Sequence, residues 1–95
     1  MSYSVSPELY RETAVRLADA LDGGGYFSGS VRFAFGGMEC RLTASDIVCR
    51  RRESLPEGDV DAVADLVPVW WEFRTADGEG EVANDFSFSE MKAYL

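Results

Sequence analysis

The chain of 95 residues contains no histidine and only two cysteines. It therefore lacks the commonest general base and the commonest metal ligand of proteins. It also has no phosphate-binding glycine loop with a lysine, no nucleophile elbow, and no acidic run with the spacing of a calcium loop. We therefore expect no catalytic residues, no metal and no cofactor, and we interpret the protein as not an enzyme.

Long apolar runs and positive charge are also scarce. No stretch approaches the roughly 20 apolar residues that span a membrane, and the N-terminal residues do not resemble a signal peptide. We therefore expect a cytoplasmic protein with no membrane partner. Seventeen acidic residues against nine basic ones give a net charge of −8, which argues against nucleic acid as a partner.

What is present is enough apolar surface for one domain over residues 1–95, since 46% of the residues are hydrophobic and 13% are aromatic. Ser6-Pro7 followed by apolar residues at helical spacing predicts a first helix over roughly 7–22. Ser87 and Glu90 form a capping box that predicts a short last helix over roughly 88–95.

Three hairpins are predicted between these helices. A Gly36-Gly37 turn brings six apolar residues onto one face, pairing Phe35 with Met38, Phe33 with Cys40, and Val31 with Leu42. An Asp77-Gly78 turn pairs Arg74 with Glu81, Phe73 with Val82, and Val69 with Phe86, although Gly80 also allows a shifted loop with a bulge. A turn at Ala44-Ser45 pairs Leu42 with Ile47 and Cys40 with Cys49.

These elements predict an α+β fold: a helix, an antiparallel meander sheet of about five strands, and a short C-terminal helix. Each helix has one apolar face, so we expect both on one face of the sheet, with the other face open. Residues 53–66 are compatible with a short helix from Asp59 or with a strand, and we favour a solvated acidic connector.

The two cysteines, Cys40 and Cys49, become cross-strand neighbours in the predicted Ala44-Ser45 hairpin. A disulfide between them is geometrically conceivable. Reduced core thiols fit a reducing cytosol better, and we expect that state.

Strand alternation places the two tryptophans on opposite faces, with Trp71 in the core beside Val69 and Phe73 and Trp70 on the open face. The registers place six candidate site residues there: Trp70, Glu72, Arg32, Arg41, Arg50 and Arg52. An exposed tryptophan near arginines is typical of interface hot spots. A purely local arrangement is the alternative, with Trp70 stacked on an arginine and Glu39 and Glu72 neutralising the rest.

We therefore carry two hypotheses for function. The first is a protein-interaction module that uses the open face around Trp70 to bind a protein partner or a second copy of itself. The second is a small-molecule or anion-binding domain that uses the cluster Arg32, Arg41, Arg50 and Arg52.

Overall fold

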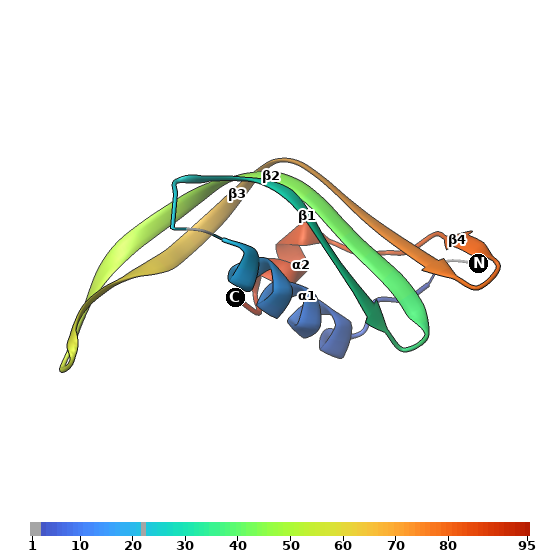
Figure 1. The fold of residues 1–95 in the computed structure, drawn as a ribbon, viewed down its shortest axis with the longest axis horizontal. Coiled ribbons are helices and arrows are strands. Elements are labelled where there is room, and N and C mark those ends of the chain that lie inside the picture. Colours follow the sequence, from blue (N-terminus) through green and yellow to red (C-terminus); the bar gives the residue numbers. More distant parts are fainter. Residues whose placement is uncertain (1–2, 22) are drawn as a thin grey trace.

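The computed structural model describes residues 3–21 and 23–95, which form two helices on one side of an antiparallel sheet (Figure 1). The elements are α1 (Pro7–Ala20), β1 (Tyr26–Phe35), β2 (Met38–Leu55), β3 (Gly58–Asp77), β4 (Gly80–Val82) and α2 (Phe88–Lys92). The strands lie in the order β1-β2-β3-β4, and a bridge from Tyr3 to Asn84 joins the N-terminal segment to the chain after β4. The predicted α+β class, meander order and placement of both helices are confirmed.

Both helices begin at the predicted capping residues. The Oγ of Ser6 accepts a hydrogen bond from the backbone N–H of Leu9 at 3.2 Å, and the Oγ of Ser87 accepts one from Glu90 at 3.4 Å. These bonds satisfy N–H groups that have no partner within the helix. The last helix ends at Lys92, earlier than predicted, and Leu95 stays exposed.

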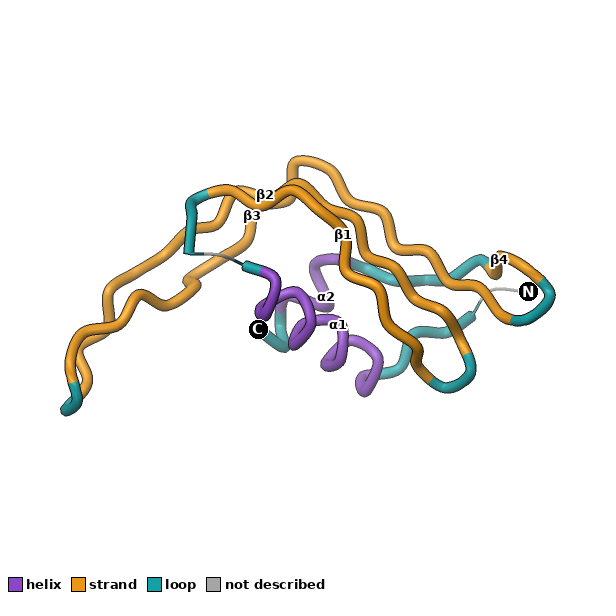
Figure 2. The backbone as a smooth tube through the Cα atoms, in the orientation of Figure 1, coloured by secondary structure: helices purple, strands orange, loops and turns teal. Residues whose placement is uncertain are grey.

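The core lies between the helices and the inner face of the sheet, which is the face that both helices cover (Figure 2). Phe73 and Phe86 stack at its centre, with ring centroids 4.0 Å apart. Around them lie buried residues from every main element except β4, including Leu9, Leu17, Phe33, Leu42, Leu66, Phe88 and Met91. Burial of this apolar set is the main favourable term holding helices and sheet together.

The Gly36-Gly37 hairpin has the predicted register, with Phe35 opposite Met38 and Phe33 opposite Cys40. Gly36 has φ 57° and Gly37 has φ 81°. Positive φ at both central residues is what a type I′ turn requires and what glycine adopts without steric cost. The prediction from this pair of glycines is confirmed.

The predicted turn at Ala44-Ser45 is wrong, because β2 runs without interruption from Met38 to Leu55. Ala44 lies opposite Gly29 of β1 and Trp71 of β3. Pairing on both sides satisfies the backbone polar groups of this segment in an extended conformation, so a turn would add no hydrogen bonds that the strand lacks.

The expected neighbourhood of the two cysteines is wrong for the same reason. Cys40 lies opposite Phe33 and Thr75, whereas Cys49 lies opposite Asp65. Both thiols are free; Cys40 is buried and Cys49 is exposed. Burial, with a smaller contribution from the charge of Glu39, raises the pKa of the Cys40 thiol.

The last hairpin has the shifted loop rather than the Asp77-Gly78 turn. Asp77 pairs with Gly80, and Thr75 pairs with Val82, so the loop residues are Gly78 and Glu79. The Oδ1 of Asp77 accepts a hydrogen bond from the N–H of Glu79 at 2.8 Å, and Gly80 has φ 131°. The shift moves each partner by two positions, so the side chains from Trp70 to Val82 keep their predicted faces.

Residues 53–66 are not a connector, because they form the end of β2, a turn at Pro56-Glu57 and the start of β3. We call residues 49–66 the arm. The sequence of these β3 residues has only weak helical or apolar periodicity. Pairing with β2 supplies partners for their backbone N–H and C=O groups. The arm extends past the helices (Figure 1), and the molecule measures 49 × 25 × 18 Å.

Candidate functional site

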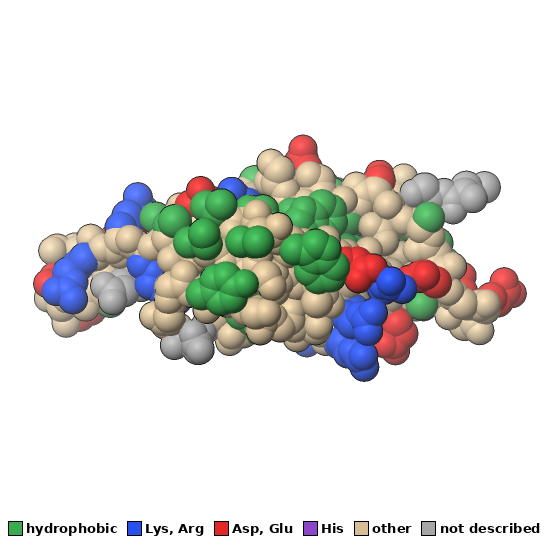
Figure 3. Space-filling view, turned by 90° about the horizontal axis from the view of Figure 1, so that it is seen from above, with side chains coloured by type: hydrophobic (Ala, Val, Ile, Leu, Met, Phe, Trp, Pro, Cys, Tyr) green, Lys and Arg blue, Asp and Glu red, His purple; other side chains and the backbone are tan. Residues whose placement is uncertain are grey.

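The outer face of the sheet, opposite the helices, carries a contiguous group of exposed apolar side chains (Figure 3). Tyr26 of β1 lies opposite Ile47 of β2, and Ile47 lies opposite Val67 of β3. Trp70 stands one outer-face row further along β3, opposite Ser45. We call these four residues, Tyr26, Ile47, Val67 and Trp70, the apolar patch.

Trp70 lies on the predicted face, and 52% of its surface is exposed. Trp71 points to the helix side, where its ring lies 5.8 Å from Phe86 and 6.2 Å from Phe88 between centroids. The two tryptophans therefore occupy opposite faces as predicted. Trp71 lies at the margin of the core rather than deep within it, since 37% of its surface remains exposed.

The expected place of Val69 in the core, opposite Phe86, is wrong. The pairing of β3 with β2 shifts between Ser45 and Asp46, and Val69 is the extra residue of this β-bulge. One extra residue exchanges the faces of the residues that precede it in β3, here Asp65 to Pro68, as far as the second bulge at Ala64. Leu66 is therefore fully buried, whereas 42% of Val67 and 66% of Val69 is exposed. The bulge thereby adds Val67 to the apolar patch.

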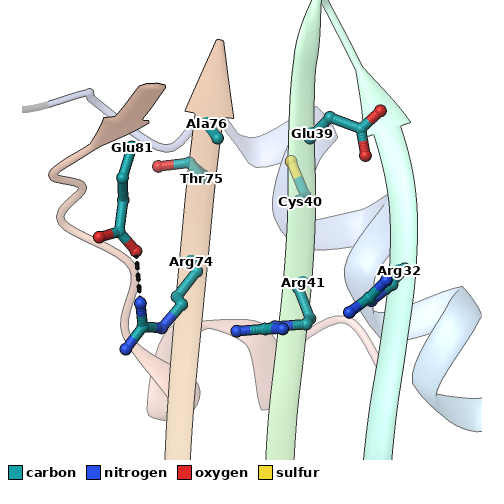
Figure 4. Close-up of a pocket in the computed structure, with 8 residues that line it drawn as sticks. All are labelled: Arg32, Glu39, Cys40, Arg41, Arg74, Thr75, Ala76 and Glu81. Atoms are coloured by element: carbon teal, nitrogen blue, oxygen red, sulfur yellow. Dashed lines mark hydrogen bonds and ion pairs between the residues drawn. The ribbon is translucent and has the colours of Figure 1, made fainter. Parts of the chain in front are cut away.

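A row of three arginines crosses the same outer face closer to the hairpin turns (Figure 4). Arg32 of β1 lies opposite Arg41 of β2, as predicted, and Arg41 lies opposite Arg74 of β3. We call these three residues the arginine row. With neighbouring side chains, including Glu39 and Glu81, they line a shallow depression of about 400 Å³.

Glu72 and Glu81 hold one member of the row. The Nε of Arg74 donates to Glu72 at 2.7 Å and its Nη1 donates to Glu81 at 2.9 Å. The hydrogen bond to Glu72, followed by the charges of both carboxylates, raises the pKa of Arg74. Glu72 thus lies on the open face as predicted, where it positions an arginine that the sequence reasoning had not included among the site residues.

Arg50 and Arg52 do not join this cluster, and their expected position on the open face is wrong. Because β2 continues through Ala44-Ser45, these two residues alternate in phase with buried Val48, on the face opposite Arg41. The Nε of Arg50 donates to the carbonyl oxygen of Gly24 at 3.1 Å. The four-arginine cluster therefore divides into one pair beside the depression and one pair on the arm.

Asp46 is a feature that the sequence reasoning passed over. It lies on the inner face beside the bulge, opposite Phe27 and Pro68. Its side chain is fully buried, and within the described chain neither carboxylate oxygen has a hydrogen-bond partner. Burial raises its pKa to about 6, against a smaller lowering by the charge of Lys92. Its alternation with Leu42, Ala44 and Val48 is the signal that places it inside.

Among the described residues, no group of three acidic or cysteine side chains is arranged to hold a metal ion. No helix in the described ranges has the length and apolar character needed to cross a membrane. The site therefore consists of the apolar patch and the arginine row on one open sheet face. The chain matches no protein-family model, no curated protein and no solved structure, so what this face does must be argued from its geometry.

Proposed function

We propose that this protein is a small non-catalytic interaction module that binds another protein chain through its open sheet face. The single observation that carries the proposal is the exposure of Trp70 among Tyr26, Ile47 and Val67. Leaving one large apolar side chain in water forgoes roughly 1.5–3 kcal/mol of burial energy. Scattered exposed apolar residues are normal, whereas a contiguous group rimmed by polar residues marks interaction sites.

The surroundings of the patch also resemble a protein interface. Ser28 and Ser45 are hydrogen-bonded to each other beside Trp70 at 3.1 Å, and Arg74 with its two glutamates lies further along the same strands. Interfaces typically have an apolar centre enriched in aromatic residues and a polar rim. Trp70 would be the anchor at that centre, and the serines and ion pairs would form the rim.

The edge of β3 is a less suitable surface for a partner strand. In the described chain, β3 has no strand beyond it from Gly58 to Arg74. Pro68 lacks an N–H group, and the bulges at Val69 and Ala64 interrupt the regular spacing of the backbone groups. Prolines and bulges are devices that prevent strand addition at exposed edges. These features favour binding by the face.

A second copy of the chain is the partner to test first, because an exposed sheet face can pack on itself about a two-fold axis. Light scattering over a series of protein concentrations would measure the mass in solution. We expect concentration-dependent dimers for the wild type and monomers for Trp70→Ala, with little change in the melting temperature of the variant monomer. Val15→Ala is the matched control, because Val15 is an exposed apolar residue on α1.

Trp71→Ala completes the test, because Trp71 contacts the core through Phe86 and Phe88. We expect this variant to melt earlier while the mass still rises with concentration at temperatures where it is folded. The proposal fails if Trp70→Ala melts as early as Trp71→Ala and neither changes the mass. A wild type that stays monomeric at every concentration excludes the second copy as the partner.

A further inference from the structure

We infer that the arginine row, Arg32, Arg41 and Arg74, forms a binding site for a small phosphate-type oxyanion. The site goes beyond the proposed interaction and does not depend on it, because Trp71, Glu72 and Phe73 separate Trp70 from Arg74, the member of the row on β3. Its three members come from three adjacent strands and stand side by side on the outer face (Figure 4).

The unsatisfied part of the row is the pair Arg32 and Arg41. They lie directly opposite each other across two antiparallel strands, an arrangement in which like charges destabilise the pairing. Counting from the Gly36-Gly37 turn, theirs is a non-hydrogen-bonded pair, where side chains approach most closely. Within the described chain, neither guanidinium has an ion pair or a side-chain hydrogen bond.

The nearby acids leave this pair uncompensated. Glu72 and Glu81 both bind Arg74. Glu39 lines the depression, but its carboxylate extends sideways across β1, and no ion pair in the described chain joins it to Arg32 or Arg41 (Figure 4). Two adjacent guanidinium groups therefore point over the surface with no negative partner, on a chain whose net charge is −8. A bound anion would remove their repulsion and satisfy their donors.

The chemistry of the row indicates which anion fits. A guanidinium group offers a planar fork of donors that matches phosphate oxygens, and two adjacent forks supply the charge to hold a dianion. The depression of about 400 Å³ lies in the range of small-ligand sites. The acidic residues Glu39 and Glu81 in its lining, together with the acidic chain, disfavour an extended polyanion such as nucleic acid and favour a compact ligand.

Titration calorimetry with inorganic pyrophosphate on the whole protein, at constant ionic strength set by sodium chloride, tests the site. We expect saturable one-to-one binding. Arg41→Gln and, separately, Arg32→Gln should each weaken it by about 10-fold or more, since a charge-assisted hydrogen bond contributes that much to affinity. Glu39→Gln should strengthen binding by removing a nearby negative charge.

Two matched controls make the result specific. Arg51→Gln removes an arginine of the arm that pairs with Glu53, and Trp70→Ala removes the centre of the apolar patch. Neither should change pyrophosphate affinity by more than about twofold if binding is local to the row. Arg41→Gln should lose pyrophosphate binding and keep normal self-association, whereas Trp70→Ala should lose self-association and keep pyrophosphate binding. Either result separates this site from the proposed interaction.

A stability measurement without ligand guards against unfolding as a cause. Because Arg32 and Arg41 repel each other, Arg32→Gln should melt no earlier than the wild type, and pyrophosphate should raise the melting temperature of the wild type but not of this variant. Absence of saturable pyrophosphate binding to the wild type overturns the inference. An equal loss of affinity in Arg51→Gln and Arg41→Gln also overturns it, because general charge would then explain the binding.

Discussion

Replacing Asp46 by asparagine tests the most unusual electrostatic feature of the core. The carboxylate is fully buried on the inner face of β2, and none of the described residues donates a hydrogen bond to either oxygen. Lys92 acts on it only through its charge, while its ammonium group is bound to Asp65 at 2.7 Å. Asparagine has nearly the same shape and cannot ionise, so the substitution isolates the cost of the charge.

The magnitude follows from the shift in pKa. Burial raises the pKa of Asp46 from its ordinary value of 3.8 to about 6, which at 1.36 kcal/mol per unit corresponds to about 3 kcal/mol. A raised pKa means that the folded state binds the proton more tightly than the unfolded state. The stabilising contribution is therefore complete below pH 3.8 and is lost as the pH rises through about 6.

Urea unfolding of the wild type and of Asp46→Asn across about pH 4 to about pH 8 measures the effect. The asparagine variant carries its own cost of a buried amide, but that cost does not change with pH. We therefore expect the wild type to lose about 2 kcal/mol relative to the variant between these limits, because the unfolded carboxyl group is already partly ionised at about pH 4. Removing the lysine charge with Lys92→Met should move the transition to higher pH, because that charge lowers the pKa of Asp46.

The reasoning is refuted if the difference in unfolding free energy between wild type and Asp46→Asn is the same at all pH values. Asp65 provides an opposite control. The hydrogen bond from Lys92, followed by the N–H of Leu66, lowers the pKa of Asp65. Its contribution to stability is therefore present above its unfolded pKa and is lost as the pH falls, so Asp65→Asn should change the pH profile in the opposite direction.

Two further predictions concern the fold. Leu66→Ala should cost about 2–5 kcal/mol of unfolding free energy, and Val67→Ala should cost less than about 0.5 kcal/mol. The two costs differ because the bulge buries Leu66 completely and leaves Val67 exposed. Equal costs in urea unfolding would contradict the observed register. Ser6→Ala should cost about 1 kcal/mol of unfolding free energy, because it removes the hydroxyl oxygen that accepts the hydrogen bond from the N–H of Leu9. Ser4→Ala is the control, because Ser4 is exposed and lies outside the helix. Thermal unfolding of this control should show no change.

Features encoded by a few adjacent residues could be predicted from the sequence. The caps at Ser6 and Ser87 depend on one side-chain oxygen and the next helical turn. The Gly36-Gly37 turn depends on two residues that adopt positive φ without a side-chain clash. The Asp77-Gly78 turn does not form because Gly80 offers a second position for positive φ, and the carboxylate of Asp77 stabilises the loop that uses it.

The continuity of β2 could not be predicted because it depends on partners distant in sequence. Small and polar residues around Ala44-Ser45 permit a turn, and no local signal opposes one. The segment is extended because β1 and β3 pair with it from both sides. Context of this kind overrides local preference in strands more than in helices.

The irregularities of the strands determine which candidate site residues can be assigned to the correct sheet face from the sequence. Counting faces by alternation is reliable only from an anchored residue to the next irregularity, because one bulge or one wrongly placed turn exchanges the faces beyond it. Trp70 was placed correctly from Phe73 because the bulge at Val69 lies one residue further along the count. Arg50 and Arg52 were placed wrongly because the count from Arg41 passed through a turn that does not exist. The proposed anion site therefore consists of arginines within a few residues of the Gly36-Gly37 hairpin, together with Arg74, which β2 pairing brings beside them.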